Sequence, residues 1–437
     1  MTTASSEKYC VIGAGAAGLA VVKTFQSLGV PCECLEQNND VGGIWNYGTK
    51  HSSVYKSTHL ISSKRYAEFI DFPMPDHYPA YPSHSQVLDY LRSFASHFDL
   101  YKLISLGTTV QHVEPLDIGC EVTVAGEAKP RRYAGVVVAN GHLWSPVIPD
   151  FPGTFAGMIM HARDYKTYDQ LVGRRVLIVG VGNSGCDIAV ESGRHALATF
   201  QSMRRGHYFV PKFLFGTPID SGSDLLYRLQ APHWVHRLFA SIPLQIALGN
   251  PREWGLPIPD HKFLDEPPIP NSDLLNAVGH GRVHVKPGIA QLRGDYVRFN
   301  DGSEEQIDVI VLATGYRIHF PFLSSQHWDE NACPPQLFLN AFHPRLDNLM
   351  FAGLFDASVK TWELVEHQAQ LMVHFIKARQ VNDASVEWFR QLKAHPEPSR
   401  GVETDTRRFL YREYFAYRRQ ISRLLKRFQK VSLRTSQ

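Results

Sequence analysis

The sequence lacks several features that would assign it to a class at once. None of its six cysteines forms a Cys-x-x-Cys pair, no run approaches the ~18 apolar residues of a membrane span, and 45 Lys and Arg nearly balance 42 Asp and Glu. These absences argue against a disulfide reductase, a chain that spans a bilayer, and a protein built to bind a polyanion. The cysteines show neither zinc-ligand spacing nor a disulfide framework, so we expect no metal site and a reduced, cytoplasmic setting.

The length and composition indicate an ordinary globular protein. At 437 residues, with 44% hydrophobic and 20% charged residues, the chain is expected to form two or three domains with sizeable cores. Residues 1–8 are polar and contain no apolar signal core.

The first informative feature is a glycine-rich loop between a predicted strand and a predicted helix. An apolar run at 9–12 enters Gly13-Ala-Gly15-Ala-Ala-Gly18, apolar residues follow at helical spacing to Gly29, and a second strand ends at Glu36. In this context the glycines let the backbone approach a pyrophosphate at the helix start, and a carboxylate such as Glu36 accepts hydrogen bonds from a ribose. The expected contacts to this first dinucleotide are Gly13, Gly15, Ala16, Ala17, Gly18, Glu36 and Gln37.

A second loop of the same kind follows the predicted strand 175–180. Here the next strand ends in Ser202-Met-Arg204-Arg205, with two arginines where a carboxylate would stand. Guanidinium groups bind a 2′-phosphate, which favours NADPH, although the two arginines could also be solvated surface charge. The expected contacts to this second dinucleotide are Gly180, Gly182, Asn183, Ser184, Gly185, Asp187, Ser202, Arg204 and Arg205.

Between the two loops lies a connector with a distinctive pattern. The stretch Phe155-Ala-Gly157-Met-Ile-Met-His161-Ala-Arg-Asp-Tyr165, just before the second loop, resembles the fingerprint of the flavin-containing monooxygenases. The resemblance extends over nearly the whole chain and is weakest at 209–276 and after 378.

The resemblance implies an α/β fold with two Rossmann-like dinucleotide-binding domains, the NADPH domain inserted into the FAD domain. We expect residues 1–165 to form the first part of the FAD domain, 166–283 the NADPH domain, and 284–437 the second part of the FAD domain. Gly42-Gly43 before Trp45 lets the backbone pass close to a flat ring. By resemblance, the FAD site also includes Gly43, Ile44, Trp45, Thr314, Gly315 and Gln368.

The implied activity is that of an NADPH-dependent monooxygenase. In that family a C4a-hydroperoxyflavin transfers one oxygen atom to an amine or a sulfide, so FAD, NADPH, O₂ and a small-molecule substrate are the expected ligands. Baeyer–Villiger oxygenation of ketones and a non-catalytic dinucleotide sensor remain as alternatives. We expect no nucleic-acid partner, and a homodimer stays open.

One position departs from the family pattern. Ile61 stands where most members have an asparagine that hydrogen-bonds the oxygenated flavin, and isoleucine cannot donate a hydrogen bond. The nearest polar candidate is His59, since some bacterial relatives use histidine in this neighbourhood, and His59 could equally be structural. By resemblance we expect His59 as a catalytic group, with Ile61 and Ser62 beside the cofactor.

Other segments give structural expectations. Ser83 to Leu100 has the apolar spacing of an amphipathic helix, and strands at 109–114, 121–124 and 133–139 suggest an antiparallel insertion. From 404 to 430 arginines alternate with apolar residues, which indicates a basic helical region docked on the FAD domain; membrane-surface or nucleic-acid contact is the alternative.

Overall fold

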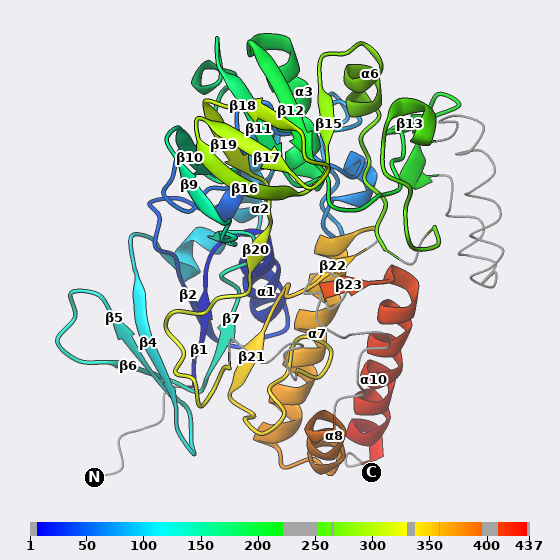
Figure 1. Cartoon of the computed structure of the whole chain (residues 1–437). Coiled ribbons are helices and arrows are strands. Elements are labelled where there is room, and N and C mark those ends of the chain that lie inside the picture. Colours follow the sequence, from blue (N-terminus) through cyan, green and yellow to red (C-terminus); the bar gives the residue numbers. More distant parts are fainter. Residues whose placement is uncertain are drawn as a thin grey trace. The chain divides into compact units, whose positions relative to one another are not determined.

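The computed structural model describes residues 7–221, 251–263, 266–329, 337–357, 359–395 and 410–434. The chain forms two compact units, which Figure 1 shows in sequence colours. Unit 1 contains Met1–Ser52, Lys64–His142 and Ile318–Gln437, and unit 2 contains Ser53–Ser63 and Leu143–Arg317. Each unit has its own parallel sheet with helices packed against it, so the expected α/β class with two Rossmann-like folds is confirmed.

Unit 1 is organised around a five-stranded sheet in which every pair of neighbours is parallel. Its order is β21 (Leu349–Phe351), β7 (Gly135–Val138), β1 (Tyr9–Ile12), β2 (Cys32–Leu35), β3 (Ile104–Ser105). Strands β1, β7 and β21 are buried along their whole length, which explains their continuous apolar runs. Helix α1 (Ala16–Ser27) packs on α7 (Thr361–Gln380), where Lys23 Nζ meets Glu366 Oε1 at 2.8 Å.

The helix expected after Ser83 is α2 (His84–His97), and Ser83 caps it. The side chains of Ser83 and Gln86 each accept a hydrogen bond from the other's backbone N–H, which satisfies two donors at the helix start. The antiparallel insertion is β4 (Val110–Pro115), β5 (Cys120–Val124) and β6 (Arg131–Tyr133). The expectation that 133–139 forms the last strand of this insertion was wrong in part, because Gly135–Val138 instead forms β7 of the parallel sheet.

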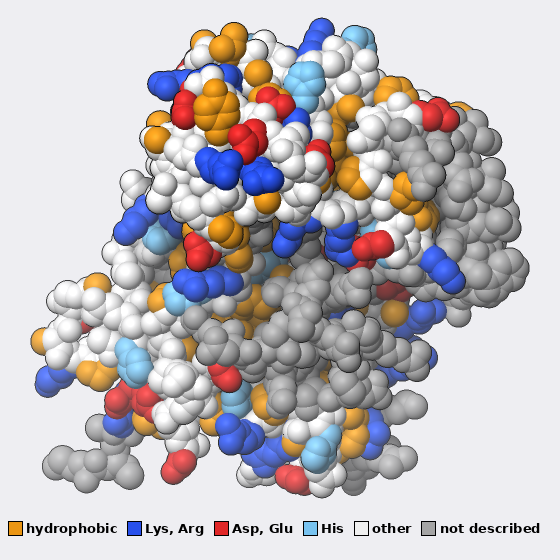
Figure 2. Space-filling model, viewed as in Figure 1, with side chains coloured by type: hydrophobic (Ala, Val, Ile, Leu, Met, Phe, Trp, Pro, Cys, Tyr) orange, Lys and Arg blue, Asp and Glu red, His pale blue; other side chains and the backbone are white. Residues whose placement is uncertain are grey.

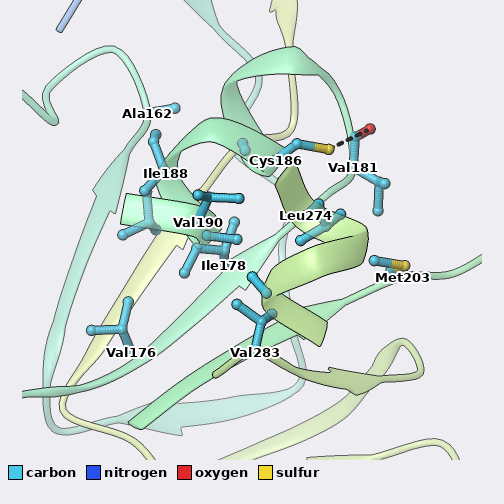
Figure 3. Packing of buried hydrophobic residues seen from close by; sticks show 14 of the residues in the cluster. Ala162, Val176, Ile178, Val181, Cys186, Ile188, Val190, Met203, Leu274 and Val283 are labelled. Carbon is cyan, nitrogen blue, oxygen red and sulfur yellow. Dashed lines mark hydrogen bonds between the residues drawn. The ribbon is translucent and has the colours of Figure 1, made fainter. Parts of the chain in front are cut away.

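Unit 2 repeats the plan of the first sheet. Its parallel order is β10 (Met158–His161), β19 (Val309–Leu312), β11 (Arg175–Val179), β12 (Ala198–Ser202), β15 (His284–Lys286). Helices α3 (Asn183–His195) and α6 (Asp273–Gly279) lie together over this sheet. Figure 3 shows Ile188 and Val190 of α3 directed toward Ile178 of β11, with Leu274 and Val283 completing the buried cluster.

A second layer covers the other face of the unit 2 sheet. Strands β18 (Glu304–Gln306), β17 (Tyr296–Phe299), β16 (Ile289–Gly294) and β9 (Gly153–Phe155) form it in that order. Val297 and Phe299 of β17 share a buried cluster with Leu177 and Ile310 of the central strands. Asp301-Gly302 forms the tight turn between β17 and β18, with Gly302 at φ 84°.

The remaining elements are short. The short strands are β8 (Ser145–Pro146), β13 (Phe213–Leu214), β14 (Thr217–Pro218), β20 (Tyr316–Arg317), β22 (Asp356–Ala357) and β23 (Tyr411–Arg412). The 3₁₀ turns are η1 (Gly43–Trp45), η2 (Lys64–Tyr66), η3 (Leu100–Leu103), η4 (Tyr168–Gln170), η5 (Ile219–Ser221) and η6 (Pro251–Trp254).

The structure divides the chain at other places than the sequence suggested. We expected 284–437 to return to the first domain, but β15 pairs with β12, and β19 pairs with both β10 and β11. Residues 284–317 therefore belong to unit 2, as does the connector from Leu143 onward. The expectation failed because strand pairing joins segments far apart in sequence, which a local apolar run cannot reveal.

The C-terminal helices pack on unit 1, as the docking interpretation proposed. Helix α10 (Tyr414–Arg434) lies along α7, and α8 (Ser385–Ala394) contacts both, as Figure 1 shows in orange to red. Tyr417, Ile421 and Leu424 are buried, whereas Arg419 and Arg423 are exposed. The apolar face of α10 is therefore used within the unit.

Charges of both signs are mixed on the molecular surface. On the face shown in Figure 2, Lys and Arg side chains lie close to Asp and Glu side chains. Within the described ranges no helix is long and apolar enough to cross a membrane, and no three potential metal ligands cluster together. All five cysteines in those ranges are buried as free thiols.

Glu363 of α7 holds the C-terminal helix in place. Its carboxylate accepts a hydrogen bond from Tyr414 Oη, lies 3.0 Å from Lys360 Nζ, and also faces His367 and Arg418. Burial alone would raise the pKa of Glu363, but the hydrogen bonds from His367, Tyr414 and Lys360 outweigh it and lower the pKa to about 2. The charged form of Glu363 is thus favoured by folding.

We expect Glu363→Gln to lower the free energy of unfolding at neutral pH by about 3 kcal/mol, since a shift of the pKa from 4.5 to about 2 has that size. Because the pKa is depressed, this stability is present above pH 4.5 and is lost as the pH falls toward 2. Denaturant titration at pH 7 and pH 3 measures both effects. The matched control is Glu387→Gln on α8, a carboxylate that is 65% exposed. Equal losses in the two variants would contradict the role of Glu363.

Candidate functional site

The first glycine-rich loop has no room for side chains at two positions. Gly13 adopts φ 101°, and a Cβ there would lie 2.9 Å from the carbonyl oxygen of Ala139. A Cβ on Gly18 would lie 1.8 Å from the carbonyl oxygen of Gly13. The strand end and the helix start can approach this closely only because both residues are glycine.

The second loop is built in the same way. Gly180 adopts φ 110°, where a Cβ would lie 2.5 Å from the Ala313 oxygen, and a Cβ on Gly185 would lie 2.5 Å from the Gly180 oxygen. Each loop thus packs against a turn that follows a neighbouring strand, Ala139-Asn-Gly141 or Ala313-Thr-Gly315. Sequence reasoning missed this equivalence, although the repeated Ala-x-Gly after an apolar strand is a usable signal.

Both helix starts that follow these loops can hold a phosphate. Gly15 and Gly182 are the residues before α1 and α3, neither helix start receives a side-chain cap, and neither first turn contains an acidic residue. The first-turn N–H groups, which belong to Ala16, Ala17 and Gly18 in α1 and to Asn183, Ser184 and Gly185 in α3, point along the helix dipole. A pyrophosphate satisfies such groups, so both sites fit a dinucleotide.

Glu36 lies at the end of β2, beside the first loop. Its Oε2 accepts the Ala14 N–H at 2.7 Å, and its Oε1 accepts both the backbone N–H and the side-chain amide of Asn38 at 2.8 Å. Burial raises the pKa of Glu36, while these hydrogen bonds oppose the shift. A carboxylate has about four acceptor positions, so one remains for a ribose hydroxyl.

The Gly42-Gly43 segment closes over the first loop. Gly42 N–H donates to Ala14 O at 2.9 Å, and a Cβ on Gly43, at φ 56°, would lie 3.0 Å from the Gly15 Cα. Ser52 Oγ holds the Ile44 carbonyl at 2.7 Å, Trp45 is partly exposed beside it, and Gln37 is exposed. The structure therefore brings the residues predicted for the first dinucleotide into one site within unit 1.

Gln368 is placed differently from our expectation. It is fully buried, its Oε1 accepts the Gly353 N–H at 3.1 Å, and its Nε2 donates to Leu339 O and Tyr417 Oη. The hydrogen bonds of its amide therefore all go to groups of unit 1. Gln368 thus positions Gly353, where a Cβ would lie 2.7 Å from the Ala17 side chain at the start of α1.

The connector residues are buried and have structural partners. His161 is 3% exposed; its Nδ1 accepts the Arg163 N–H at 3.1 Å and its Nε2 donates to Gly315 O at 3.1 Å. Burial lowers the pKa of His161, in keeping with a neutral ring that bridges two backbone groups. Tyr165 is fully buried and donates its hydroxyl to Glu191 of α3. These two positions of the motif thus anchor the connector to the second sheet.

Thr314 and Gly315 lie beside the second loop, not the first. They follow β19 within unit 2, and Thr314 Oγ1 donates to Val147 O at 2.6 Å. The turn adjoins Gly180, since a Cβ there would lie 3.8 Å from Thr314 N. The expectation that the two residues belong to the FAD domain was therefore wrong, because β19 joins the second sheet.

His59, Ile61 and Ser62 also belong to unit 2. His59 is exposed, and its Nδ1 lies 2.9 Å from the carbonyl oxygen of Ser57. Ile61 is 48% exposed, as are several other large apolar side chains in the described part of the chain. The structure thus separates these residues, by unit, from the Gly43–Trp45 segment that precedes them in sequence.

The end of β12 holds the two arginines. Arg204 is exposed, and its side chain would lie 3.4 Å from a Cβ on Gly288. Arg205 makes two hydrogen bonds with the buried carboxylate of Glu266, at 2.9 and 2.7 Å, a partner that the sequence did not suggest. Ser202 is buried and donates its hydroxyl to Pro287 O at 2.8 Å. Of the three predicted residues, Arg204 is the one with an available side chain.

Two parallel sheets, each with a glycine-rich loop and a helix start that can hold a phosphate, form the kind of fold that suits a protein with two dinucleotides. The chain belongs to the flavin-binding monooxygenase-like family, whose model matches residues 6–427. This family uses FAD and NADPH, in agreement with the two expected cofactors. The family resemblance predicted from the connector is confirmed.

Individual relatives agree with this assignment. Human flavin-containing monooxygenase 5 is 35% identical over 343 residues, 73% of this chain and 63% of that protein. The chain thus spans less than two thirds of that relative's length. Rabbit dimethylaniline monooxygenase [N-oxide-forming] 2 is 33% identical over 394 residues, 85% of this chain and 74% of that protein.

Solved structures share the fold. S-allyl-L-cysteine S-oxygenase from Allium sativum superposes with a TM-score of 0.67 at 21% identity, over 98% of this chain and 92% of that chain. Cyclohexanone monooxygenase in its open form gives a TM-score of 0.71 at 17% identity, over 96% and 98% of the two chains.

Gly18 and Gly15 of the first motif differ in how closely they are packed, so their alanine variants should have opposite outcomes. Gly18→Ala should lower the free energy of unfolding by about 3 kcal/mol or more, because its Cβ meets a backbone oxygen. Gly15→Ala should fold normally, since φ is −73° and the nearest atom to its Cβ is 3.5 Å away, yet it should lose FAD because the methyl group occupies the pyrophosphate position. Thermal melting of the flavin-free proteins and flavin absorbance after reconstitution test this. Full flavin content in Gly15→Ala would contradict the site.

Proposed function

We propose that this protein is an FAD-dependent monooxygenase that uses NADPH and O₂ to insert one oxygen atom into a soft nucleophile, an amine or a sulfide. The observation that supports the proposal most directly is the paired construction of the two loops. In each loop one glycine packs against an Ala-x-Gly turn and a later glycine packs against the first. Each loop is followed by an uncapped helix start free of acidic residues. Two phosphate sites built in the same way suit two dinucleotide cofactors, one that accepts a hydride and one that delivers it.

Within this proposal FAD occupies unit 1 and NADPH occupies unit 2. Bound and reduced, FAD supplies the activation of O₂. Glu36 and the first turn of α1 bind and orient the FAD ribose and pyrophosphate, and Trp45 shields the adjoining ring from water. Gln368 acts through Gly353, and His59 is the candidate donor that replaces the missing asparagine, since its Nε2 has no partner among the described residues.

Oxygenation of ketones is a second candidate, because Ile61 removes the donor that amine- and sulfide-oxygenating members use. A protein that binds both nucleotides without turnover would be a sensor. Reconstituted protein should be yellow and should oxidise NADPH faster when a substrate is present. Mass spectrometry of products across amines, sulfides and ketones then assigns the reaction. Tight binding of both cofactors with no oxygenated product would contradict the proposed function.

The arginines after β12 give a graded prediction for cofactor choice. Arg204→Ala should weaken NADPH binding roughly 10- to 150-fold, the loss of one charge-assisted phosphate contact of about 1.5–3 kcal/mol, and leave NADH binding nearly unchanged. Arg205→Ala should affect NADPH less, because Glu266 already engages its guanidinium. Nucleotide titrations measure both. Arg293→Ala, on β16, removes an arginine that is 48% exposed and serves as the control. Equal losses for NADH and NADPH would mean that Arg204 does not bind the 2′-phosphate.

A further inference from the structure

A short stretch of the N-terminal sequence is attached to unit 2. The 53–63 segment, which contains His59 and Ile61, follows the Gly43–Trp45 turn directly in sequence but belongs to the unit of the second glycine-rich loop. Its ends are held there by hydrogen bonds. Lys56 N–H donates to Lys166 O at 2.9 Å and Lys166 Nζ to Val54 O at 3.1 Å, while Ser63 donates its N–H and Oγ to Asp220 at 2.6 and 2.8 Å.

Two side chains of the segment reach helix α3 itself. Tyr55 Oη donates to Asp187 Oδ2 at 2.8 Å, and Ser57 Oγ donates to Glu191 Oε2 at 3.0 Å. Asp187 and Glu191 are one helical turn apart, so they face the segment together. Tyr55 is also buried against the ring of Tyr165, whose centroid lies 5.7 Å away.

Each carboxylate is shared with another part of unit 2. Asp187 Oδ1 accepts the side-chain amide of Asn271 at 2.8 Å, and Glu191 accepts the hydroxyl of the connector residue Tyr165. Burial raises the pKa of Asp187, while its hydrogen bonds to Tyr55 and Asn271 oppose this. Removing one of these donors from a partly buried carboxylate costs free energy, because the carboxylate is left with an unsatisfied acceptor. The hydrogen bonds therefore favour one position of the segment on α3.

We propose that Tyr55 and Ser57, with their partners Asp187 and Glu191, are positioning residues that fasten the 53–63 segment to the helix of the nucleotide loop, so that His59 and Ile61 are placed by the same body that binds NADPH. Asp187 follows the loop glycine Gly185 closely along α3. A nucleotide that orders the start of α3 therefore also orders the segment, and by reciprocity an ordered segment favours the nucleotide-bound helix. The role in the reaction rests on the proposed function.

The test uses the FAD-loaded protein with Tyr55→Phe, Ser57→Ala and the double variant. Each substitution removes one hydroxyl and leaves the packing, including the ring contact of Tyr55, nearly intact. The matched control is Tyr133→Phe, which removes a hydroxyl that donates to Glu33 at 2.9 Å in unit 1. Amide hydrogen exchange of 53–63 is followed with and without NADP⁺, together with the rate of flavin reduction, the KM for NADPH and the share of oxidised NADPH that appears as H₂O₂.

We expect exchange in 53–63 to become about 2- to 10-fold faster in each single variant, as for the loss of one hydrogen bond, and faster still in the double variant. The degree to which NADP⁺ slows amide exchange in 53–63 should decrease in the same order, least in the single variants and most in the double variant. The rate of flavin reduction should change by less than about twofold, whereas the KM for NADPH should rise in parallel with the lost protection and the H₂O₂ share should rise at least about twofold. Tyr133→Phe should change none of these quantities.

Unchanged exchange in the variants would overturn the fastening. Faster exchange with an unchanged share of H₂O₂ would overturn the positioning role, because the segment would then be held without consequence for the reaction. Wild-type protein that binds FAD but does not oxidise NADPH would instead overturn the proposed function and the positioning role with it. In that case the exchange data would still decide whether the segment is fastened to α3.

Discussion

The close packing of glycine backbone against a neighbouring carbonyl oxygen is the constraint on which both halves of this structure depend. Gly13 meets Ala139, and Gly180 meets Ala313, at distances that admit no side chain. In each unit, the strand that leads into the glycine-rich loop pairs with the strand that leads into the Ala-x-Gly turn. These pairs are β1 with β7 in unit 1 and β11 with β19 in unit 2. The helix that follows each loop then starts at the carboxyl edge of its sheet, where a dinucleotide binds. A single packing rule, used twice, thus places both cofactor sites.

Around these loops the polar groups hold one another in place through hydrogen bonds within each unit. Glu36 accepts three hydrogen bonds from Ala14 and Asn38, Gln368 fixes Gly353, and His161 joins the connector to Gly315. Because these side chains are already hydrogen-bonded within the protein, less reorganisation is needed when a ligand binds. The side chains of Gln368 and Ser202 likewise hydrogen-bond backbone groups.

The unit to which the 53–63 segment belongs connects the structure with the proposed reaction. The family assignment rests on sequence over nearly the whole chain, and solved enzymes with different activities share the fold. Ile61 is exposed on a segment whose Tyr55 and Ser57 donate hydrogen bonds to Asp187 and Glu191 of α3. Residues 53–63 follow the Gly43–Trp45 turn of unit 1 in sequence but belong to the unit that contains the second loop. The positioning role proposed above links nucleotide binding at that loop with the surroundings of His59.

The sequence by itself determined the local features: the two glycine-rich loops, the α2 helix with its Ser83 cap, and the clustering of Glu36 and Gly43 around the first loop. These features depend on backbone conformation and residue spacing over a few positions, which the local sequence specifies directly. The tertiary structure alone decided that β19 joins the second sheet, that Gly135–Val138 leaves the antiparallel insertion, and that Glu266 takes Arg205. Those outcomes follow from strand pairing and buried charge pairing between segments tens to more than a hundred residues apart, and no local pattern specifies which distant partner wins.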